Sequence, residues 1–464
     1  MKVLKFGGTS LGSAERMKSV LAIVENQLLT SNDGKILVVL SAVAGTTDEL
    51  ENIADHVEKS KCQLAIKQVQ ELKSFYLDYT NKLFNNILNT KKSDLFIGEI
   101  LDSITSKIES KINTNLSRPL NNSFKRSFNS NDLLTRADIL SVGELISTQL
   151  FHFLLEEFSC SNTRLNSLDF LKTDELGVPD LIMLKKSLSQ KIESKKEINI
   201  FVAQGFICRN NQGEMSNLKR GGSDYSASLF AEAIGSEELQ IWTDIDGMHN
   251  NDPRYVNGTK TIRNISFDEA AELAYFGAKI LHPSSIKPAR KNNIPVRLLN
   301  TLQPEALGTL ISKISERKLV KAVAAKDGIT AIKIRSSEML EAQGFLRKIF
   351  EVFEDNKTSI DMIATSEVAV SVTIDNVDYL SSIIEELSLF SQVDVDSELS
   401  IICVVGEHLI ENHDVVSQVT HSLKTIPVRM ISYGGSPHNI SLLVPSENKV
   451  KALNLLQKGL FSDI

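Results

Sequence analysis

The sequence predicts an α/β protein with an open, mostly parallel sheet sandwiched by helices, followed by two small ferredoxin-like βαββαβ units. Three observations support this prediction. The chain opens on a strand, a glycine-rich loop and a helix; a wholly apolar strand follows; and one short β-rich pattern occurs twice in the C-terminal region. A helix that begins directly after such a loop is a common place for phosphate to bind.

The opening loop, "KFGGTSLGS" (residues 5–13), is the first candidate phosphate site. It follows a strand expected over Val3–Phe6. It is not a Walker loop, because Ser13 rather than lysine follows Gly12, and it does not fit the dinucleotide pattern Gly-x-Gly-x-x-Gly. If this loop binds phosphate, the cation must come from the strand before it, where Lys5 stands.

The next elements alternate as an α/β sandwich requires. Ser13 is a suitable N-cap for a helix whose apolar residues recur at helical spacing as far as Leu28. Ile36–Leu40 is a continuous apolar run, typical of a strand buried on both faces of a parallel sheet. Residues 48–160 have a mostly helical pattern. Further strands are expected at three later runs: Ile198–Ala203, Leu239–Thr243 and Ile294–Leu299.

The character of the chain changes after a loop that contains Pro304 and Gly308. We expect a large α/β domain over residues 1–300, a linker over 301–322 and two small units over 323–396 and 397–464. The first small unit is expected to contain a strand, a helix and a hairpin: Gly328–Ser336, Gly344–Asp355, and Ser359–Thr365 with Val368–Ile374. The second repeats this order: Ser400–Gly406, Val415–Leu423, and Pro427–Ser432 with Asn439–Val444. Two unrelated hairpins are the alternative to an internal duplication.

Composition excludes several classes of protein. The formal charge of −7 and the lack of a long basic run argue against a nucleic-acid-binding protein. The four cysteines and eight histidines lack the spacings of a disulfide framework or a metal site. Met1 leads directly into a strand pattern, and no apolar run is long enough to cross a bilayer. We therefore expect a soluble, cytoplasmic protein with no membrane partner.

Polar residues follow the second strand and interrupt an apolar helix. The loop "SAVAGTT" (residues 41–47) is rich in hydroxyl groups that can bind a polar substrate. The stretch "SVGELIST" (residues 141–148) places Glu144 among apolar residues. A buried carboxylate needs a partner, which could equally be the ammonium group of a substrate or a structural arginine.

Three later stretches add candidate ligand contacts. In "KRGGSDYSA" the glycines allow close backbone approach, Ser223 and Asp224 begin a helix, and Arg220 offers a two-point contact for a carboxylate. "IWTDIDGMHNNDPR" ends a strand where nucleotide sites of open α/β sheets commonly lie, although an ordinary turn is the alternative. "FGAKILHP" closes a helix begun by a capping box at Ser266 and offers Lys279 as a second cation, with a surface lysine as the alternative.

In this order, the stretches resemble the aspartate kinases of the amino acid kinase superfamily over essentially the whole chain. The duplication resembles the tandem ACT modules with which these enzymes sense end-product amino acids. "MLEAQGFL", "SIDMIATSEVAVSVTI" and "VRMISYGGSPHNISLLV" are most similar to the lysine-sensitive, monofunctional branch. The chain has no segment that corresponds to the homoserine dehydrogenase of the bifunctional branch.

The resemblance implies a reaction. ATP, with Mg²⁺ bound to its phosphates, would phosphorylate the β-carboxylate of L-aspartate to give 4-phospho-L-aspartate, the first step of lysine, threonine and methionine biosynthesis. A kinase for another amino acid, such as glutamate or acetylglutamate, is one alternative, and a catalytically inactive amino-acid sensor is another. The presence of Lys5, Asp224 and Lys279 argues against the inactive sensor.

The resemblance also assigns the site residues. It implies that Lys5 and Lys279 stabilise the transferring phosphate and that Asp224 orients them. The implied ATP contacts are Lys5, Gly7, Gly8, Ser10, Thr243, Asp244, His249, Arg254 and Lys279. The implied aspartate contacts are Ser41, Thr47, Glu144 (for the ammonium group), Phe206, Arg220 (for the α-carboxylate) and Ser223. Two positions depart from the family pattern, since Lys219 replaces a usual glycine and His249 a frequent tyrosine.

A pocket for L-lysine is implied in the first ACT unit. Its lining would be Met339, Ala342, Gly344, Phe345, Leu346, Ser359, Ile360, Asp361, Thr365, Ser366 and Glu367. The acidic pair Asp361 and Glu367 suits the two positive charges of lysine, whereas threonine would leave one carboxylate unpaired. Ala342 replaces a frequent serine, so one hydroxyl contact is missing. ACT sheets usually pair between chains, which implies a homodimer, with a tetramer left open; dimerisation without an effector is the alternative.

Overall fold

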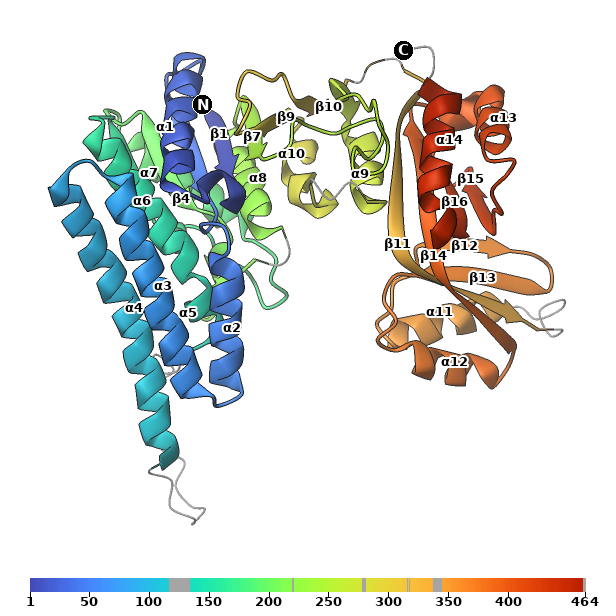
Figure 1. Cartoon of the computed structure of the whole chain (residues 1–464), viewed down its shortest axis with the longest axis horizontal. Coiled ribbons are helices and arrows are strands. Elements are labelled where there is room, and N and C mark those ends of the chain that lie inside the picture. The colour runs from blue at the N-terminus through green and yellow to red at the C-terminus, as the bar shows by residue number, and fades with distance from the viewer. Residues whose placement is uncertain are drawn as a thin grey trace. The chain divides into compact units, whose positions relative to one another are not determined.

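The computed structural model describes residues 1–116, 134–218, 221–277, 281–314, 316, 318–336 and 344–461 (Figure 1). The chain divides into two compact units. Unit 1 comprises Met1–Gly247 with Leu281–Lys313, and unit 2 comprises Met248–Ile280 with Ile314–Ile464. Residues 248–280 therefore group with the C-terminal region, although the sequence places them in the domain 1–300. The domain boundaries drawn from the sequence stay a prediction.

Unit 1 is built on a mostly parallel sheet, which confirms the predicted fold class. Its strands are hydrogen-bonded in the order β3-β4-β2-β1-β7-β9-β10. Their bounds are β1 Lys2–Phe6, β2 Ile36–Leu40, β3 Asn162–Leu165, β4 Ile200–Gln204, β7 Glu238–Thr243, β9 Val296–Asn300 and β10 Thr309–Ser312. Among these neighbouring strands, β9 and β10 pair antiparallel and all the other pairs are parallel. All five side chains of β2 are buried, as its apolar run predicts.

Helices pack on the faces of this sheet. The helices of unit 1 are α1 Ala14–Leu29, α2 Thr46–Glu58, α3 Cys62–Leu83, α4 Ile87–Leu116, α5 Arg136–Leu140, α6 Val142–Glu157, α7 Leu181–Glu193, α8 Gly222–Ile234 and α10 Lys287–Lys291. Ser13 caps α1 as predicted, because its Oγ accepts a hydrogen bond from the Arg16 N–H. In β1, Leu4 and Phe6 point into the core formed with α1 and α6. Lys5 alternates to the opposite face, which α8 covers.

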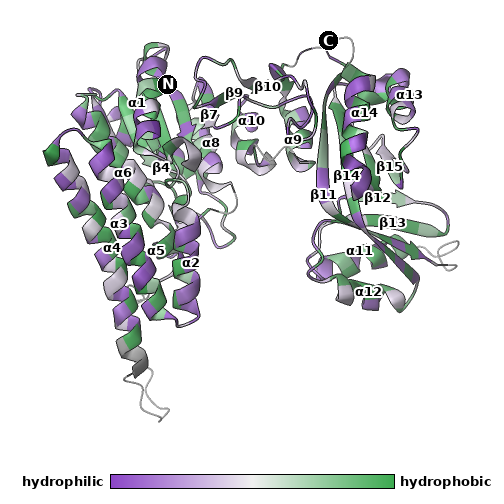
Figure 2. Cartoon of the chain, viewed as in Figure 1, coloured by the Kyte–Doolittle hydropathy of each residue, from purple (hydrophilic) through white to green (hydrophobic). Residues whose placement is uncertain are grey.

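The long helices α3 and α4 lie side by side in Figure 1 and bury one side each. Figure 2 shows hydrophobic and hydrophilic residues alternating along both helices. A short hairpin of β5 (Ile207–Arg209) and β6 (Met215–Asn217) completes unit 1. Within the described ranges, no helix of the chain is long and apolar enough to cross a membrane.

Unit 2 is built on an antiparallel sheet of order β12-β13-β11-β14-β16-β15. The strands of this sheet are β11 Val320–Arg335, β12 Met362–Thr365, β13 Ala369–Ile374, β14 Gln392–Gly406, β15 Met430–Tyr433 and β16 Asn439–Pro445. Unit 2 also contains the short strand β8 (Asn264–Ser266), which is not part of this sheet. The helix bounds are α9 Phe267–Tyr275, α11 Phe345–Asp355, α12 Leu380–Ser388, α13 His413–Ser422 and α14 Lys449–Phe461. A helix, a hairpin and a second helix follow each of β11 and β14, which confirms the predicted duplication.

The long strands β11 and β14 each serve both repeats. Residues 331–335 pair with 392–396, whereas residues 320–326 pair with 401–406. Between these stretches the register shifts, and Gly328 (φ 75°) and Glu398 (φ 58°) adopt the left-handed backbone conformation. The second repeat is therefore completed by the N-terminal half of β11. The segment predicted as a linker also contains β10 and the start of β11.

Candidate active site

An ion pair joins β1 to the first turn of α8. Lys5 Nζ lies 2.7 Å from Asp224 Oδ1, and the two side chains are only 11 % and 16 % exposed. Asp224 is placed there because α8 begins at Gly222, directly after Gly221, which has a φ of 76° that favours glycine. The pair brings together two predicted catalytic residues that are far apart in the sequence.

The glycine-rich loop packs tightly against its surroundings. The Gly7 N–H donates to the carbonyl of Trp242 at 3.2 Å, and the Ala44 N–H donates to the Gly8 carbonyl at 3.1 Å. A Cβ on Gly8 would lie 3.0 Å from the carbonyl oxygen of Ala42. Any side chain at this position would therefore push the loop away from the loop that follows β2.

A cavity of about 460 Å³ surrounds the ion pair at the carboxyl ends of β1 and β2. Ligands of open α/β sheets bind at this edge. The cavity collects eight of the predicted site residues: Lys5, Gly8, Ser41, Thr47, Glu144, Phe206, Ser223 and Asp224. Thr9 and residues 42–45 also line it, and the sequence analysis gave none of them an individual contact.

Glu144 is the buried carboxylate of this cavity. It lies in the first turn of α6, is 4 % exposed, and accepts a hydrogen bond from the Ala42 N–H at 3.2 Å. Burial raises the pKa of Glu144 to about 8, although this backbone contact and the charge of Lys5 act in the opposite direction. Among the described residues no arginine pairs with Glu144, so the structural-arginine alternative gains no support there.

Phe206 is held in the cavity by a strained backbone. Its φ is 66°, which is unusual for a bulky residue, and its N–H donates to Ser226 Oγ at 2.8 Å. A Cβ on Gly222 would lie 2.6 Å from Phe206 Cδ2. The second glycine of "KRGGSD" therefore makes room for the aromatic ring, in addition to starting α8.

The predicted nucleotide contacts lie in both units. Thr243 ends β7 in unit 1, where its hydroxyl donates to the adjacent Asp244 at 3.1 Å. Ser10 Oγ lies 2.6 Å from Thr301 Oγ1 in a buried contact, so this hydroxyl ties the loop to the end of β9. In unit 2, His249 contacts Thr259 and Arg254 forms a two-point pair with Asp252. Arg220, Lys279 and the departure Lys219 lie outside the described residues.

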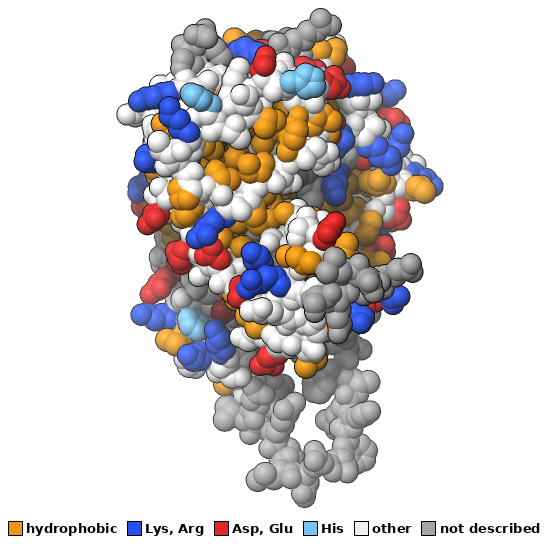
Figure 3. Space-filling view, turned by 90° about the vertical axis from the view of Figure 1, so that its right-hand side faces the viewer, with side chains coloured by type: hydrophobic (Ala, Val, Ile, Leu, Met, Phe, Trp, Pro, Cys, Tyr) orange, Lys and Arg blue, Asp and Glu red, His pale blue; other side chains and the backbone are white. Residues whose placement is uncertain are grey.

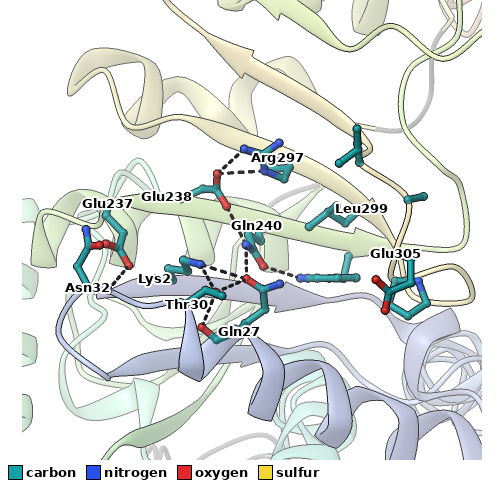
Figure 4. Close-up of a pocket in the computed structure, with 14 residues that line it drawn as sticks. Lys2, Gln27, Thr30, Asn32, Glu237, Glu238, Gln240, Arg297, Leu299 and Glu305 are labelled. Atoms are coloured by element: carbon teal, nitrogen blue, oxygen red, sulfur yellow. Dashed lines mark hydrogen bonds and ion pairs between the residues drawn. The ribbon is translucent and has the colours of Figure 1, made fainter.

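A second cavity, of about 590 Å³, lies at the start of β1, and Figure 4 shows its polar lining. Lys2 Nζ donates to Gln27 Oε1 at 3.2 Å and to Thr30 Oγ1 at 2.7 Å. Arg297 donates to Glu238 Oε2 through Nε at 3.1 Å and lies within 2.9 Å of it through Nη2. Because Lys2 already donates hydrogen bonds to neutral groups and Arg297 is paired with Glu238, this cavity gives no reason to place the substrate there.

The residues of the predicted effector pocket lie at the edge of the first repeat. Gly344 is the N-cap of α11 (φ 91°), Phe345 belongs to the apolar core, and Leu346 is 41 % exposed. Ser359 and Ile360 precede β12, whereas Thr365, Ser366 and Glu367 are exposed at its other end. Asp361 is held by Tyr275 and Lys326, which the sequence analysis did not single out. Met339 and Ala342 lie outside the described residues.

Comparisons with known proteins agree with this architecture. The sequence model of the amino acid kinase family matches residues 1–300, and that of an ACT domain matches residues 332–383 and 402–460. Lysine-sensitive aspartokinase 3 of Escherichia coli (strain K12) is 32 % identical over 471 residues, which cover 99 % of this chain and 99 % of that protein. The chain belongs to the aspartokinase family.

Other members of the family are similar over the same length. Aspartokinase 2, chloroplastic, of Arabidopsis thaliana is 31 % identical and matches 99 % of this chain and 84 % of its own. The crystal structure of E. coli aspartokinase III in complex with aspartate and ADP (R-state) superposes with a TM-score of 0.79 at 31 % identity, covering 99 % of this chain and 100 % of that one. The structure of that enzyme with lysine and aspartate (T-state) gives 0.78. The predicted aspartokinase fold is thereby confirmed.

Proposed function

We propose that this chain transfers the terminal phosphoryl group of ATP to the β-carboxylate of L-aspartate, giving 4-phospho-L-aspartate, and that L-lysine inhibits it through the ACT region. The observation that supports the reaction best is the single cavity that holds both the Lys5–Asp224 pair and the buried Glu144. The crystallised E. coli relative holds aspartate with ADP, and lysine with aspartate.

The proposed chemistry needs no general base. The β-carboxylate of aspartate is ionised at neutral pH, because its usual pKa is about 3.9. Catalysis then consists of positioning and of stabilising the charge on the transferring phosphoryl group. Lys5 supplies one positive charge, and Asp224 fixes the Lys5 side chain in the cavity. Lys279 supplies the second charge on the strength of the family pattern.

Mg²⁺ is proposed as the partner of ATP. The described part of the chain offers no group of three potential metal-binding side chains, and Asp224 is already paired with Lys5. The site therefore fits a metal carried mainly by the oxygens of the nucleotide. When bound there, Mg²⁺ neutralises phosphate charge.

Glu144 is proposed to bind the ammonium group of aspartate. An ammonium group would give this buried carboxylate the opposite charge that it needs to stay ionised. Arg220 would bind the α-carboxylate, and Ser41, Thr47, Phe206 and Ser223 would complete the pocket. A pocket with these polar groups accommodates a small zwitterion with a second carboxylate.

Asp361 is proposed to contact the effector lysine. Its side chain is 1 % exposed, and among the described residues its Oδ2 has no hydrogen-bond donor. A buried carboxylate oxygen of this kind favours a cationic ligand. Glu367, which is exposed, would contact the second positive charge of lysine.

Unit 2 is proposed to form a homodimer. Figure 3 shows hydrophobic side chains gathered over one face of the molecule. On the neighbouring strands β12 and β15, Ile363, Ile431 and Tyr433 are between 38 % and 45 % exposed. An apolar patch of this kind is typical of a protein–protein interface. ATP as substrate and the free state of the four cysteines favour a cytoplasmic location.

The experiment is a coupled assay of ADP formation by the purified full-length chain. L-aspartate with MgATP should support turnover, and L-glutamate should not. Millimolar L-lysine should inhibit this turnover, and L-threonine should not. Lysine binding without any turnover would instead identify a catalytically inactive sensor. Equal or faster turnover with glutamate would contradict the proposed substrate.

A further inference from the structure

Two tyrosines of α3 lie one turn apart beside the active-site loops of unit 1. Tyr76 and Tyr79 are three residues apart, so their side chains share one face of the helix. Both side chains are buried. The helix packs against α1, which begins at the end of the glycine-rich loop, and against α2, which begins within the loop at residues 41–47. Both loops line the cavity around Lys5.

Tyr76 contacts the loop that follows β2. Its Oη lies 2.9 Å from Thr46 Oγ1, and both side chains are buried. Thr46 is the first residue of α2 and directly precedes Thr47, which lines the cavity. A buried hydroxyl group needs a hydrogen-bond partner, so this pair fixes the start of α2 against α3.

The same loop holds Glu144, the proposed contact for the ammonium group of aspartate. The Ala42 N–H donates to Glu144 Oε1. A Cβ on Gly143 would lie 2.5 Å from Ala42 Cβ and 3.3 Å from Thr46 Cγ2, so the start of α6 packs directly on this loop. Burial raises the pKa of Tyr76, and the charge of Glu144 acts in the same direction. A shift of Thr46 would therefore also move the N–H group that holds Glu144.

Tyr79 contacts the end of the glycine-rich loop. Its Oη lies 2.7 Å from the Leu11 carbonyl oxygen and 3.0 Å from the Ser13 carbonyl oxygen, so its proton can be donated to either. At the start of the loop, the Gly7 N–H donates to the Trp242 carbonyl. Tyr79 thus holds the part of the loop that leads into α1.

The two loops also contact each other. The Ala44 N–H donates to the Gly8 carbonyl at 3.1 Å, and the Ser41 N–H donates to the Phe6 carbonyl at 3.2 Å. One loop is proposed to bind the transferring phosphate, and the other is proposed to bind the aspartate that accepts it. The relative position of the loops then sets the distance between the reacting groups, on which the rate of transfer depends strongly.

We infer that Tyr76 and Tyr79 are positioning residues, Tyr76 for aspartate and Tyr79 for ATP. This inference rests on the proposed function, because it takes residues 41–47 as part of the aspartate site and residues 5–13 as part of the phosphate site. Neither tyrosine is among the residues that line the cavity, so each acts through the loop that it contacts. Because the two hydroxyl groups hold different loops, their effects on the two substrates are separable.

The test compares Tyr76→Phe and Tyr79→Phe in the full-length chain by steady-state kinetics. Tyr76→Phe should raise the KM for aspartate about five-fold or more and the KM for MgATP less than about two-fold, in line with the loss of one hydrogen bond. Tyr79→Phe should raise the KM for MgATP and leave that for aspartate nearly unchanged. Ser74→Ala, which removes a hydroxyl group from an exposed position of the same helix, is the matched control and should change neither KM.

A paired variant separates positioning from stability. Tyr76→Phe alone leaves the buried Thr46 hydroxyl group without its partner, which should lower the Tm. Thr46→Val combined with Tyr76→Phe removes both hydroxyl groups, so the Tm should return close to the wild-type value. The KM for aspartate should stay raised in this paired variant, because the contact between α2 and α3 is still missing. All variants are assayed well below the lowest Tm.

A KM for aspartate that returns to the wild-type value together with the Tm would overturn the inference, because the hydroxyl pair would then only stabilise the fold. Unchanged KM values in the two tyrosine variants, or equal changes for both substrates, would overturn it as well. The paired variant decides the role of Tyr76 even where Tyr76→Phe alone does not fold. A wild-type chain that does not turn over aspartate contradicts the proposed function itself.

Discussion

Lys5 Nζ and Asp224 Oδ1 lie 2.7 Å apart across the interface between β1 and α8, in a cavity where both side chains are mostly buried. The strand places the cation beside the glycine-rich loop, and the first turn of the helix holds it there. In the proposed function, this ion pair supplies the cation for phosphate that a Walker loop would take from its own lysine. The lysine comes from the strand before the loop.

Removing either partner should lower kcat. We expect Lys5→Ala and Asp224→Asn each to lower kcat by about 10²-fold or more, which is the usual loss when one preorganised electrostatic contact is removed. Lys2→Ala is the matched control, because Lys2 lies in the same strand but lines the other cavity. Steady-state kinetics measures the effect. A normal kcat in Lys5→Ala would show that this lysine is structural.

Glu144→Gln should gain stability relative to the wild type as the pH rises. Folding raises the pKa of Glu144 from its usual value of 4.5 to about 8. Between these values the native state holds a proton that the unfolded chain has released, so the contribution of Glu144 to the free energy of unfolding falls as the pH rises. Glutamine has no such proton. Thermal unfolding of the ligand-free protein at pH 5 and pH 8 measures the difference.

The control for this experiment is Glu99→Gln, at an exposed position of α4. Its Tm should differ from that of the wild type by a similar amount at both pH values. A difference for Glu144→Gln that does not grow between pH 5 and pH 8 would contradict the raised pKa. Aspartate should also fail to bind Glu144→Gln, because its ammonium group loses the charged partner that Glu144 provides.

Gly222→Ala should disturb the aspartate pocket. The new methyl group would lie 2.6 Å from Phe206 Cδ2, so the ring has to move. We expect the KM for aspartate to rise about ten-fold or more, since small displacements in an active site have large effects. The KM for ATP should change less. Gly435→Ala, where a Cβ meets nothing within 4 Å, is the control. An unchanged KM for aspartate in Gly222→Ala would show that Phe206 is not part of the aspartate pocket.

Asp361→Ala and Glu367→Ala should each relieve inhibition by lysine. The two carboxylates are proposed to bind the two positive charges of the effector, so loss of either leaves one charge without a partner. The lysine concentration for half-maximal inhibition should rise about ten-fold or more in each variant, in line with the cost of one charged hydrogen bond. If both variants are inhibited by lysine as strongly as the wild type, the effector binds at another site.

The fold could be predicted where local patterns are strong. The apolar run of β2, the N-cap of α1 at Ser13 and the capping box at Ser266 all depend on neighbouring residues, and all are confirmed. The strands β11 and β14 were predicted only in part. Their patterns break near Gly328 and Glu398, which adopt positive φ angles, and there the register shifts while the strand continues.

The site could be predicted in composition but not in its connections. The resemblance to the aspartate kinases names eight of the residues that line the cavity around Lys5, and their binding of ligands stays a prediction. No local pattern reveals that Tyr275 and Lys326 share the carboxylate of Asp361. These three residues come from separate elements, and only the folded chain brings them together. The strained φ of Phe206 was missed for the same reason.

Trapping the acyl phosphate product tests the central claim most directly. Full-length protein, MgATP and L-aspartate are incubated with hydroxylamine, which converts 4-phospho-L-aspartate to aspartate β-hydroxamate. We predict that hydroxamate forms in proportion to ADP. The Lys5→Ala variant should form hydroxamate at a rate that is lower by about 10²-fold or more. ADP without hydroxamate, or hydroxamate from glutamate at an equal rate, would contradict the account.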